Sequence, residues 1–238
     1  MSDARTAELA ANLTEVRGRI DAACRAAGRD PGDVTLIVVT KTWPSDDVRR
    51  LAGLGVRDVG ENRDQEAAPK AAATEGLDLR WHFIGQLQTN KAASVARYAD
   101  LVHSVDRPSL VAALDKGAAK AGRRIGCLIE VDLTDGEEGR GGARPDEVAA
   151  LADAIASSEH LDLRGVMGVA PLDRDDQRAA SAVAFARLAA ISADLRRAHP
   201  QATLISAGMS EDLEEAVSAG ATHLRVGSAV LGTRPSLG

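Results

Sequence analysis

Apolar residues along this chain fall into two alternating patterns, which predict strands and helices in regular succession. Short apolar runs predict buried strands at residues 34–40, 56–60, 80–85, 101–105, 125–132, 163–170, 202–208 and 222–228. Between them, helical spacing predicts helices at residues 45–54, 62–73, 88–97, 107–121, 144–159, 174–198 and 211–219. Such alternation implies right-handed crossovers and a parallel sheet, and continuously apolar strands imply burial on both faces.

One further helix is predicted ahead of the first strand. Residues 5–27 place Leu9, Leu13, Val16 and Ile20 on one helical face. Eight strand and helix units in 238 residues favour an α/β fold of the closed (β/α)8 TIM barrel type, which folds as one unit of about 250 residues. We therefore expect a single barrel domain over residues 1–238. An open doubly wound sheet is the alternative, because pattern alone can miscount strands by one.

The charge and the cysteine content limit which partners the protein can bind and in which compartment it is expected. The formal charge of −6 provides no basic field for nucleic acid or an anionic membrane. Cys24, Cys127 and the five histidines lack metal-ligand spacing, so we expect neither a metal site nor a disulfide; His82 or Trp81 should fill the barrel interior. The N-terminal segment has no signal-peptide pattern, and no run approaches the roughly 20 apolar residues of a membrane span. We expect a cytoplasmic protein, and a complete barrel suits a monomer.

Polar and glycine-rich segments collect where a (β/α)8 barrel carries its functional residues, at the carboxyl ends of the strands. They are Lys41 after the first strand, and then residues 60–62, 85–91, 134–142, 206–210 and 225–228. The loops after the seventh and eighth strands form the recurrent phosphate site of this architecture. We therefore expect an anion-binding site on that side of the barrel mouth.

Ser210, Gly227 and Ser228 are the candidate phosphate ligands. Ser210 is predicted to be the N-cap of a helix beginning at residue 211, whose free amides and dipole favour an anion. Gly208 permits close backbone approach, and Gly227 with Ser228 offers amides and a hydroxyl across from Ser210. Each residue alone is better explained as a cap or a turn. Their occurrence together after these two strands favours a phosphate site.

Lys41 follows the apolar run "LIVVT" directly. A lysine that emerges from a dry barrel interior loses hydration, which favours the neutral amine that attacks an aldehyde. An aldehyde that carries a phosphate satisfies both features: pyridoxal 5′-phosphate (PLP), or a sugar phosphate in a Schiff-base aldolase. Arg225 favours PLP, because a permanently charged arginine can face the pyridine nitrogen and keep it unprotonated.

Four segments together resemble a known family: "VVTKTWP", "GENRDQEAAPK", "WHFIGQLQTNK" and "SAGMSEDLEEAVSAGATHLRVGSAVLG". They are similar to the YggS/PROSC-type pyridoxal phosphate homeostasis proteins from about residue 8 to 234. The resemblance implies the barrel of the alanine racemase N-terminal domain, PLP fold-type III, and a role in vitamin B6 and amino-acid homeostasis. Its implied site residues are Lys41 for the Schiff base, Arg225 for the pyridine nitrogen, Ser210, Gly227 and Ser228 for the phosphate, Asn62 near the ring and Met209 against the cofactor.

Three functions are weighed from this sequence. The first is a PLP-binding protein with little or no turnover, which stores, delivers or senses PLP and could serve PLP-requiring apo-enzymes. The second is an amino-acid racemase, which needs a base on each face of the cofactor. Tyr98 is predicted in the helix after the third strand, away from the rim. Cys127 or a histidine could substitute in principle, but Cys127 falls inside its strand, so racemization is disfavoured. The third is the aldolase, which would need Lys41 and no aromatic cofactor.

Overall fold

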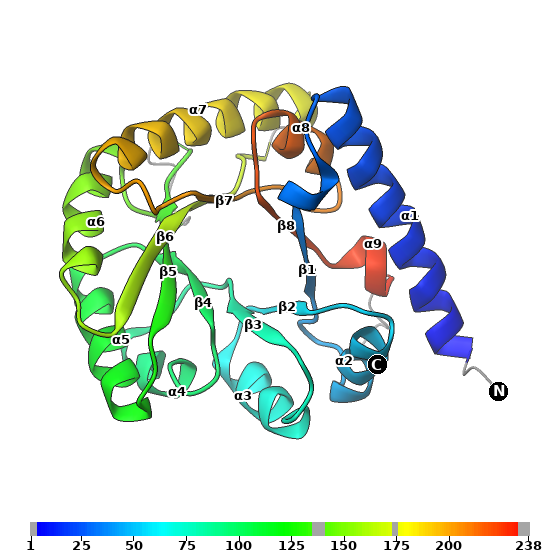
Figure 1. The fold of residues 1–238 in the computed structure, drawn as a ribbon, viewed down its shortest axis with the longest axis horizontal. Helices are drawn as coiled ribbons and strands as arrows, with labels where there is room; N and C mark the ends of the chain where they lie inside the picture. Colours follow the sequence, from blue (N-terminus) through cyan, green and yellow to red (C-terminus); the bar gives the residue numbers. More distant parts are fainter. Residues whose placement is uncertain (1–3, 135–140, 173–175, 233–238) are drawn as a thin grey trace.

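Eight parallel strands close into a barrel in the order of the sequence (Figure 1). The computed structural model describes residues 4–134, 141–172 and 176–232. The strands are β1 (Thr35–Val39), β2 (Asp58–Glu61), β3 (Arg80–Phe83), β4 (Leu101–Val105), β5 (Ile125–Val131), β6 (Leu161–Gly168), β7 (Leu204–Ser206) and β8 (His223–Val226). Because β8 pairs in parallel with β1, the sheet has no free edge. The closed (β/α)8 prediction is confirmed, and the open-sheet alternative is wrong.

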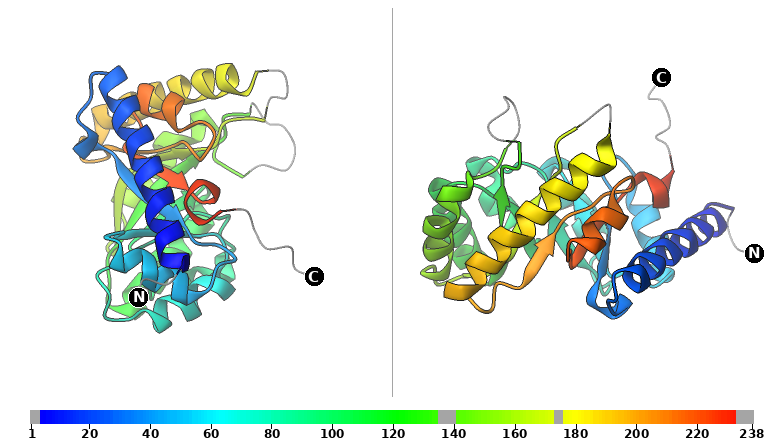
Figure 2. Two further views of the ribbon diagram at one scale, coloured as in Figure 1. Left: turned by 90° about the vertical axis from the view of Figure 1, so that its right-hand side faces the viewer. Right: turned by 90° about the horizontal axis from the view of Figure 1, so that it is seen from above.

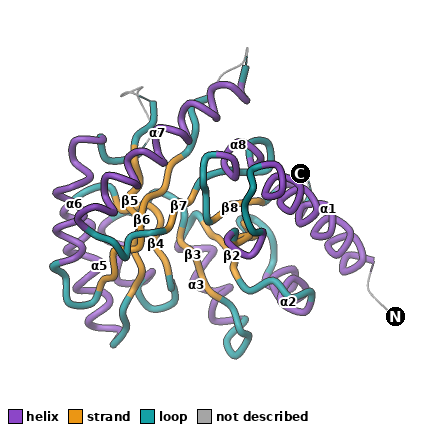
Figure 3. The backbone as a smooth tube through the Cα atoms, turned by 45° about the horizontal axis from the view of Figure 1, so that its top comes forward, coloured by secondary structure: helices purple, strands orange, loops and turns teal. Residues whose placement is uncertain are grey.

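Helices surround the barrel on its outside (Figure 3). They are α1 (Ala4–Ala26), α2 (Ser45–Gly53), α3 (Asp64–Ala73), α4 (Ala92–Val95), α5 (Pro108–Ala121), α6 (Val148–Ala156), α7 (Gln177–Ala198), α8 (Leu213–Ser218) and α9 (Ser228–Leu231). The predicted N-terminal helix is α1, and its face of Leu9, Leu13, Val16 and Ile20 is buried. Figure 2 shows α1 lying along the outside of the barrel, where it contacts α8 and α9.

Several boundaries differ from the predicted ones. The segment predicted as one helix over 88–97 is a 3-10 turn at Thr89–Lys91 followed by the short α4. Ser228, predicted to end the last strand, begins α9 instead. The reason is that β8 stops pairing with β1 at Val226, so the chain leaves the sheet there. Parts of two predicted segments, residues 135–140 and 173–175, lie outside the described residues.

The barrel has an apolar exterior and a polar interior. Leucine, valine and alanine side chains fill the space between the strands and the surrounding helices. The interior instead holds polar side chains, among them Asp58, His82, His103, Ser206 and Arg225, of which none is more than 6% exposed. His82 is hydrogen-bonded to His103 inside the barrel, whereas its strand neighbour Trp81 packs in the outer apolar core, which resolves the two options left by the sequence. In the described part of the chain, no helix is long and apolar enough to cross a membrane.

Candidate functional site

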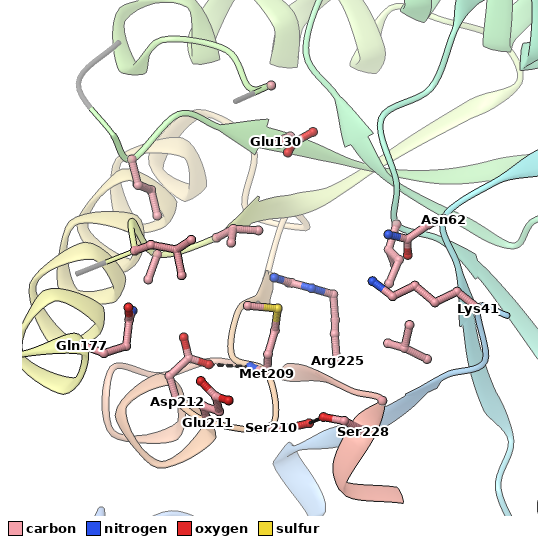
Figure 4. A pocket seen from close by; sticks show the side chains of 18 of the residues that line it. Lys41, Asn62, Glu130, Gln177, Met209, Ser210, Glu211, Asp212, Arg225 and Ser228 are labelled. Carbon is pink, nitrogen blue, oxygen red and sulfur yellow. Dashed lines mark hydrogen bonds between the residues drawn. The ribbon is translucent and has the colours of Figure 1, made fainter. Parts of the chain in front are cut away.

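One cavity at the carboxyl ends of the strands brings together the seven site residues predicted from the sequence (Figure 4). Its volume is about 890 Å³. The predicted residues that line it are Lys41, Asn62, Met209, Ser210, Arg225, Gly227 and Ser228. Sequence positions nearly 190 residues apart therefore meet at one mouth, because parallel strands present their carboxyl ends at the same edge.

Lys41 lies in the turn after β1, and the backbone on both sides of it is held by α3. The Lys70 ammonium donates to the backbone oxygen of Thr40 at 2.8 Å and to Glu61 Oε1 at 2.6 Å. The Thr42 amide, at a positive φ of 68°, donates to Glu66 Oε2 at 2.8 Å. Lys41 itself is half-buried rather than dry, so water reaches it and the expected loss of hydration is partial.

These supporting residues were missed by the reasoning from the sequence. Glu61, Glu66 and Lys70 belong to the segment "GENRDQEAAPK", in which only Asn62 was assigned a role. A signal was present: Glu66 and Lys70 are four residues apart on one helix, and the acidic Glu61 ends the strand that precedes this helix. Charged groups of opposite sign at those positions indicate a buried ionic contact beneath the lysine turn.

Asn62 follows β2 and lies beside Lys41 in the cavity (Figure 4). Its Oδ1 atom is buried and has no hydrogen-bond partner among the described residues. Gly85, after β3, lies directly against the Asn62 backbone, and a Cβ at Gly85 would be 2.2 Å from the Asn62 carbonyl oxygen. A glycine is therefore required there, and it fixes where the Asn62 backbone runs.

Ser210 and Ser228 lie next to each other in the predicted phosphate site. The Ser228 hydroxyl donates to Ser210 Oγ at 3.1 Å, and the Ala229 amide donates to the same atom at 3.3 Å. Gly227 approaches β1 closely, since a Cβ there would lie 3.3 Å from the Val39 carbonyl oxygen. Two hydroxyls and the backbone at the start of α9 thus converge on one side of the cavity.

The prediction that Ser210 is the N-cap of a helix from residue 211 is wrong. Helix α8 begins at Leu213, and Asp212 occupies the N-cap position. Asp212 Oδ1 accepts from the Met209 amide at 2.6 Å, which closes a turn over 209–212 and delays the helix. The Ser210 hydroxyl is thereby left to face α9 and the cavity. Gly208 precedes this turn at a φ of 88° with Ala216 packed against it, but it does not line the cavity, so its predicted approach to an anion stays a prediction.

Arg225 reaches the cavity from β8, within the barrel. One guanidinium nitrogen donates to Ser206 Oγ at 2.7 Å and another to the Gly168 carbonyl oxygen at 3.0 Å. Burial lowers the pKa of Arg225 to about 10, although Asp212 and Glu130 oppose this change. The side chain therefore remains charged at neutral pH, as its predicted role requires.

Glu130 on β5 also lines the cavity and was not singled out from the sequence. Burial raises the pKa of this carboxyl group to about 7; Asp106 and Asp132 add to the rise, and Arg225 opposes it. Its Oε2 atom has no hydrogen-bond partner among the described residues. The signal in the sequence was a lone acidic residue within the apolar run "IGCLIEV".

Neither Tyr98 nor Cys127, two residues considered as a second base for racemization, lines the cavity. Tyr98 lies in the turn after α4, not within a helix as predicted, and its hydroxyl donates to Asp64 Oδ1 at 3.4 Å. Cys127 is buried within β5, as predicted, and burial raises the pKa of its thiol to about 12. Both side chains are thus committed to packing away from Lys41.

Comparisons with known proteins agree with this fold and this arrangement. Residues 8–235 match the family described as alanine racemase, N-terminal domain, which defines the class of barrel. The pyridoxal phosphate homeostasis protein of Mycobacterium tuberculosis is 41% identical over 249 residues, covering 97% of this chain and 94% of that protein. The Escherichia coli protein of the same name is 35% identical over 230 residues, covering 95% and 97%.

Among solved structures, PipY of Synechococcus elongatus with PLP bound is similar to this chain. Its TM-score is 0.81 at 33% identity, covering 94% of this chain and 100% of that chain. With such identity maintained over nearly its whole length, this chain belongs to the pyridoxal phosphate homeostasis protein family.

Proposed function

We propose that this protein binds PLP through a Schiff base on Lys41 and acts in PLP homeostasis with little or no turnover. The observation that carries the proposal is one cavity that holds Lys41 on one side and the Ser210 and Ser228 hydroxyls on another. An amine and an oxyanion site in one cavity suit an aldehyde that carries a phosphate. The structure of PipY with PLP bound, and the family name, support the same ligand.

The residues present fit PLP chemically. Ser210, Gly227 and Ser228 would bind the phosphate through hydroxyl and amide donors, and Met209 would lie against the cofactor. The buried Oδ1 of Asn62 has no partner among the described residues and would be satisfied by a contact near the ring. When bound, PLP supplies an aldehyde for the lysine and a pyridine ring that can accept electrons.

Arg225 supports a low turnover. A guanidinium group has no acceptor and stays charged at neutral pH, so next to the pyridine nitrogen it disfavours a proton there. A pyridine without that proton is a weaker electron sink. The positions of Tyr98 and Cys127 also speak against racemization, since neither supplies a base at the cavity.

The proposal extends to partners and location. We infer that the protein is a monomer, because a closed barrel needs no second subunit to complete its sheet. We also infer that it acts in the cytoplasm. PLP-requiring apo-enzymes are the proposed recipients. Mixing the PLP-loaded protein with such an apo-enzyme should reactivate it faster than dissociation of PLP into solution allows; reactivation at the dissociation rate would argue for storage instead.

Absorbance spectroscopy tests PLP binding. The purified protein incubated with PLP should gain a visible absorption band, and Lys41→Ala should lose it. Lys91→Ala is the matched control, because Lys91 is also half-buried but does not line the cavity. A protein that stays colourless, or a Lys41→Ala variant as coloured as the control, would refute the proposal. Because the aldolase needs no aromatic cofactor, a protein that stays colourless with PLP but forms a borohydride-reducible adduct with a sugar phosphate on Lys41 would favour that alternative.

A further inference from the structure

A chain of buried hydrogen bonds runs through the barrel from Arg225 to the opposite end. Ser206 Oγ, which accepts from Arg225, is 2.9 Å from His103 Nδ1. His103 Nε2 is 2.9 Å from His82 Nδ1, and His82 Nε2 is 2.9 Å from Asp58 Oδ1. The contact between His103 on β4 and Ser206 on β7 joins strands that are not neighbours, so it crosses the barrel interior.

The two ends of this chain impose a direction on it. Arginine can only donate, so Ser206 Oγ accepts from Arg225. At the far end, burial raises the pKa of the Asp58 carboxyl, but His82 and Arg80 outweigh burial and hold it below its ordinary value. Asp58 is therefore an ionised acceptor, and His82 must carry a proton on Nε2 to donate to it.

The direction then determines the tautomer of each histidine. Burial lowers the pKa of His103 well below its ordinary value, so its ring is neutral and has one N–H. When His82 carries only the Nε2 proton that it donates to Asp58, His103 Nε2 donates to His82 Nδ1, and the Ser206 hydroxyl donates to His103 Nδ1. Every hydrogen bond then points from Arg225 toward Asp58, and each donor has one acceptor.

The opposite direction is disfavoured by charge. It requires a doubly protonated His82, which would donate to His103 and leave Ser206 accepting from both of its neighbours. That places a second buried positive charge in the interior that already holds Arg225. His223, whose ring centroid is 6.2 Å from that of His82, has its own pKa lowered to about 4, chiefly by burial. His82, Arg80 and Arg164 also lower the pKa of His223, and Asp58 opposes this change.

We propose that Ser206, His103, His82 and Asp58 are positioning residues for Arg225, and through it for the pyridine end of bound PLP. Two of the five guanidinium N–H donors are committed to Ser206 and Gly168, which fixes the plane of the group and aims the others. In this series of hydrogen bonds the Ser206 hydroxyl proton points toward His103 and away from Arg225. A lone pair of Ser206 Oγ therefore always faces the guanidinium group. The inference rests on the proposed function, because it concerns how Arg225 meets the cofactor.

Nitrogen NMR on the unliganded protein, labelled at histidine, tests the direction of these hydrogen bonds without any variant or cofactor. At neutral pH, His82 and His103 should each appear as the neutral tautomer with the proton on Nε2. A His103 proton on Nδ1, or a doubly protonated His82, would overturn the assigned direction. Because PLP is absent, this result stands apart from the success or failure of PLP binding.

Variants test the positioning role. Ser206→Ala should weaken PLP binding about tenfold, the effect of one lost hydrogen bond to a charged group, and should shift the pH profile of the visible band. It should also change the His82 resonances, two links away. Ser206→Thr, which keeps the hydroxyl, should restore the His82 resonances and most of the affinity.

His223→Gln is the matched control. His223 lies in the same interior beside His82 but is hydrogen-bonded to Thr222 rather than to the chain, so its replacement should leave the affinity for PLP within about twofold. Normal PLP binding, pH profile and His82 resonances in Ser206→Ala would overturn the positioning role while leaving the proposed function intact. Absence of PLP binding in the unmodified protein would refute the function instead.

Discussion

The two walls of the cavity are built from different interactions. The wall that carries Lys41 rests on buried charge, because Lys70 bridges Glu61 and the Thr40 carbonyl beneath the lysine turn. The wall that carries Ser210 and Ser228 rests on hydroxyls, backbone amides and a glycine turn. A covalent attachment point must be held in one place, which a buried ion pair achieves at a cost in desolvation. An anion site needs donors more than rigidity, so uncharged groups suffice.

The largest expected effect comes from breaking the ion pair under Lys41. Lys70→Met removes the ammonium and leaves Glu61, which is fully buried, without its charged partner. We expect a loss of about 3–5 kcal/mol in the free energy of unfolding, measured by denaturant titration. The double variant Lys70→Met/Glu61→Gln should recover most of this loss. Equal losses in the single and double variants would mean that packing, not charge, holds this wall.

Glu130 extends the comparison to a half-buried carboxyl group that forms no salt bridge with any of the residues the structure describes. Its folded-state pKa of about 7 lies above the ordinary value of 4.5, chiefly because of burial. Between these values the folded state holds the proton more tightly than the unfolded state, so this group makes the protein less stable as pH rises from 4.5 through 7. The contribution is at most about 3 kcal/mol.

Glu130→Gln isolates that contribution. The stability gained by the variant over the natural protein should be small near pH 4.5 and should grow until it levels off above pH 7. The pKa values of His103 and His223 are lowered, so these groups make the protein more stable as pH rises. Both histidines are present in the variant and in the natural protein, so their effect cancels in the difference. Denaturant titrations across pH measure it. A difference that does not change with pH would show that Glu130 titrates normally.

The glycine turn of the second wall gives the next effect. Gly208 and Gly220 both adopt positive φ, 88° and 95°, but only at Gly208 would an added Cβ meet a neighbour, Ala216 Cβ at 2.5 Å. Gly208→Ala should therefore cost about 1–3 kcal/mol more than Gly220→Ala, since both pay the same backbone strain. Thermal or denaturant unfolding measures the pair. Equal costs would mean that the turn relaxes freely.

The smallest effect on stability is expected at the hydroxyls themselves. Ser210→Ala should change the free energy of unfolding by less than about 1 kcal/mol, because the hydroxyl is partly exposed. It should weaken PLP binding by about tenfold. Pyridoxal, which lacks the phosphate, should bind the variant and the natural protein equally. A parallel loss for pyridoxal would place Ser210 elsewhere than at the phosphate.

The fold could be predicted from the sequence because its signals are local. Eight apolar runs alternating with helical patterns specify a parallel barrel, and the end of each strand specifies the functional rim. This rule reaches Lys41, Ser210, Arg225, Gly227 and Ser228 with no knowledge of side-chain contacts, whereas Asn62 and Met209 were implied by the family resemblance. What could not be predicted depends on pairs far apart in the sequence, such as His103 with Ser206. The N-cap of α8 was misassigned because Ser210 and Asp212 are both good capping residues, and the Asp212 contact with the Met209 amide decides between them.

The most direct test of the central claim is to locate the covalent bond. The PLP-treated protein is reduced with borohydride, digested and sequenced by mass spectrometry. The account predicts one pyridoxyl phosphate group per chain, on Lys41, with Lys70 and Lys91 unmodified. A label spread over several lysines, or one that leaves Lys41 free, would contradict it.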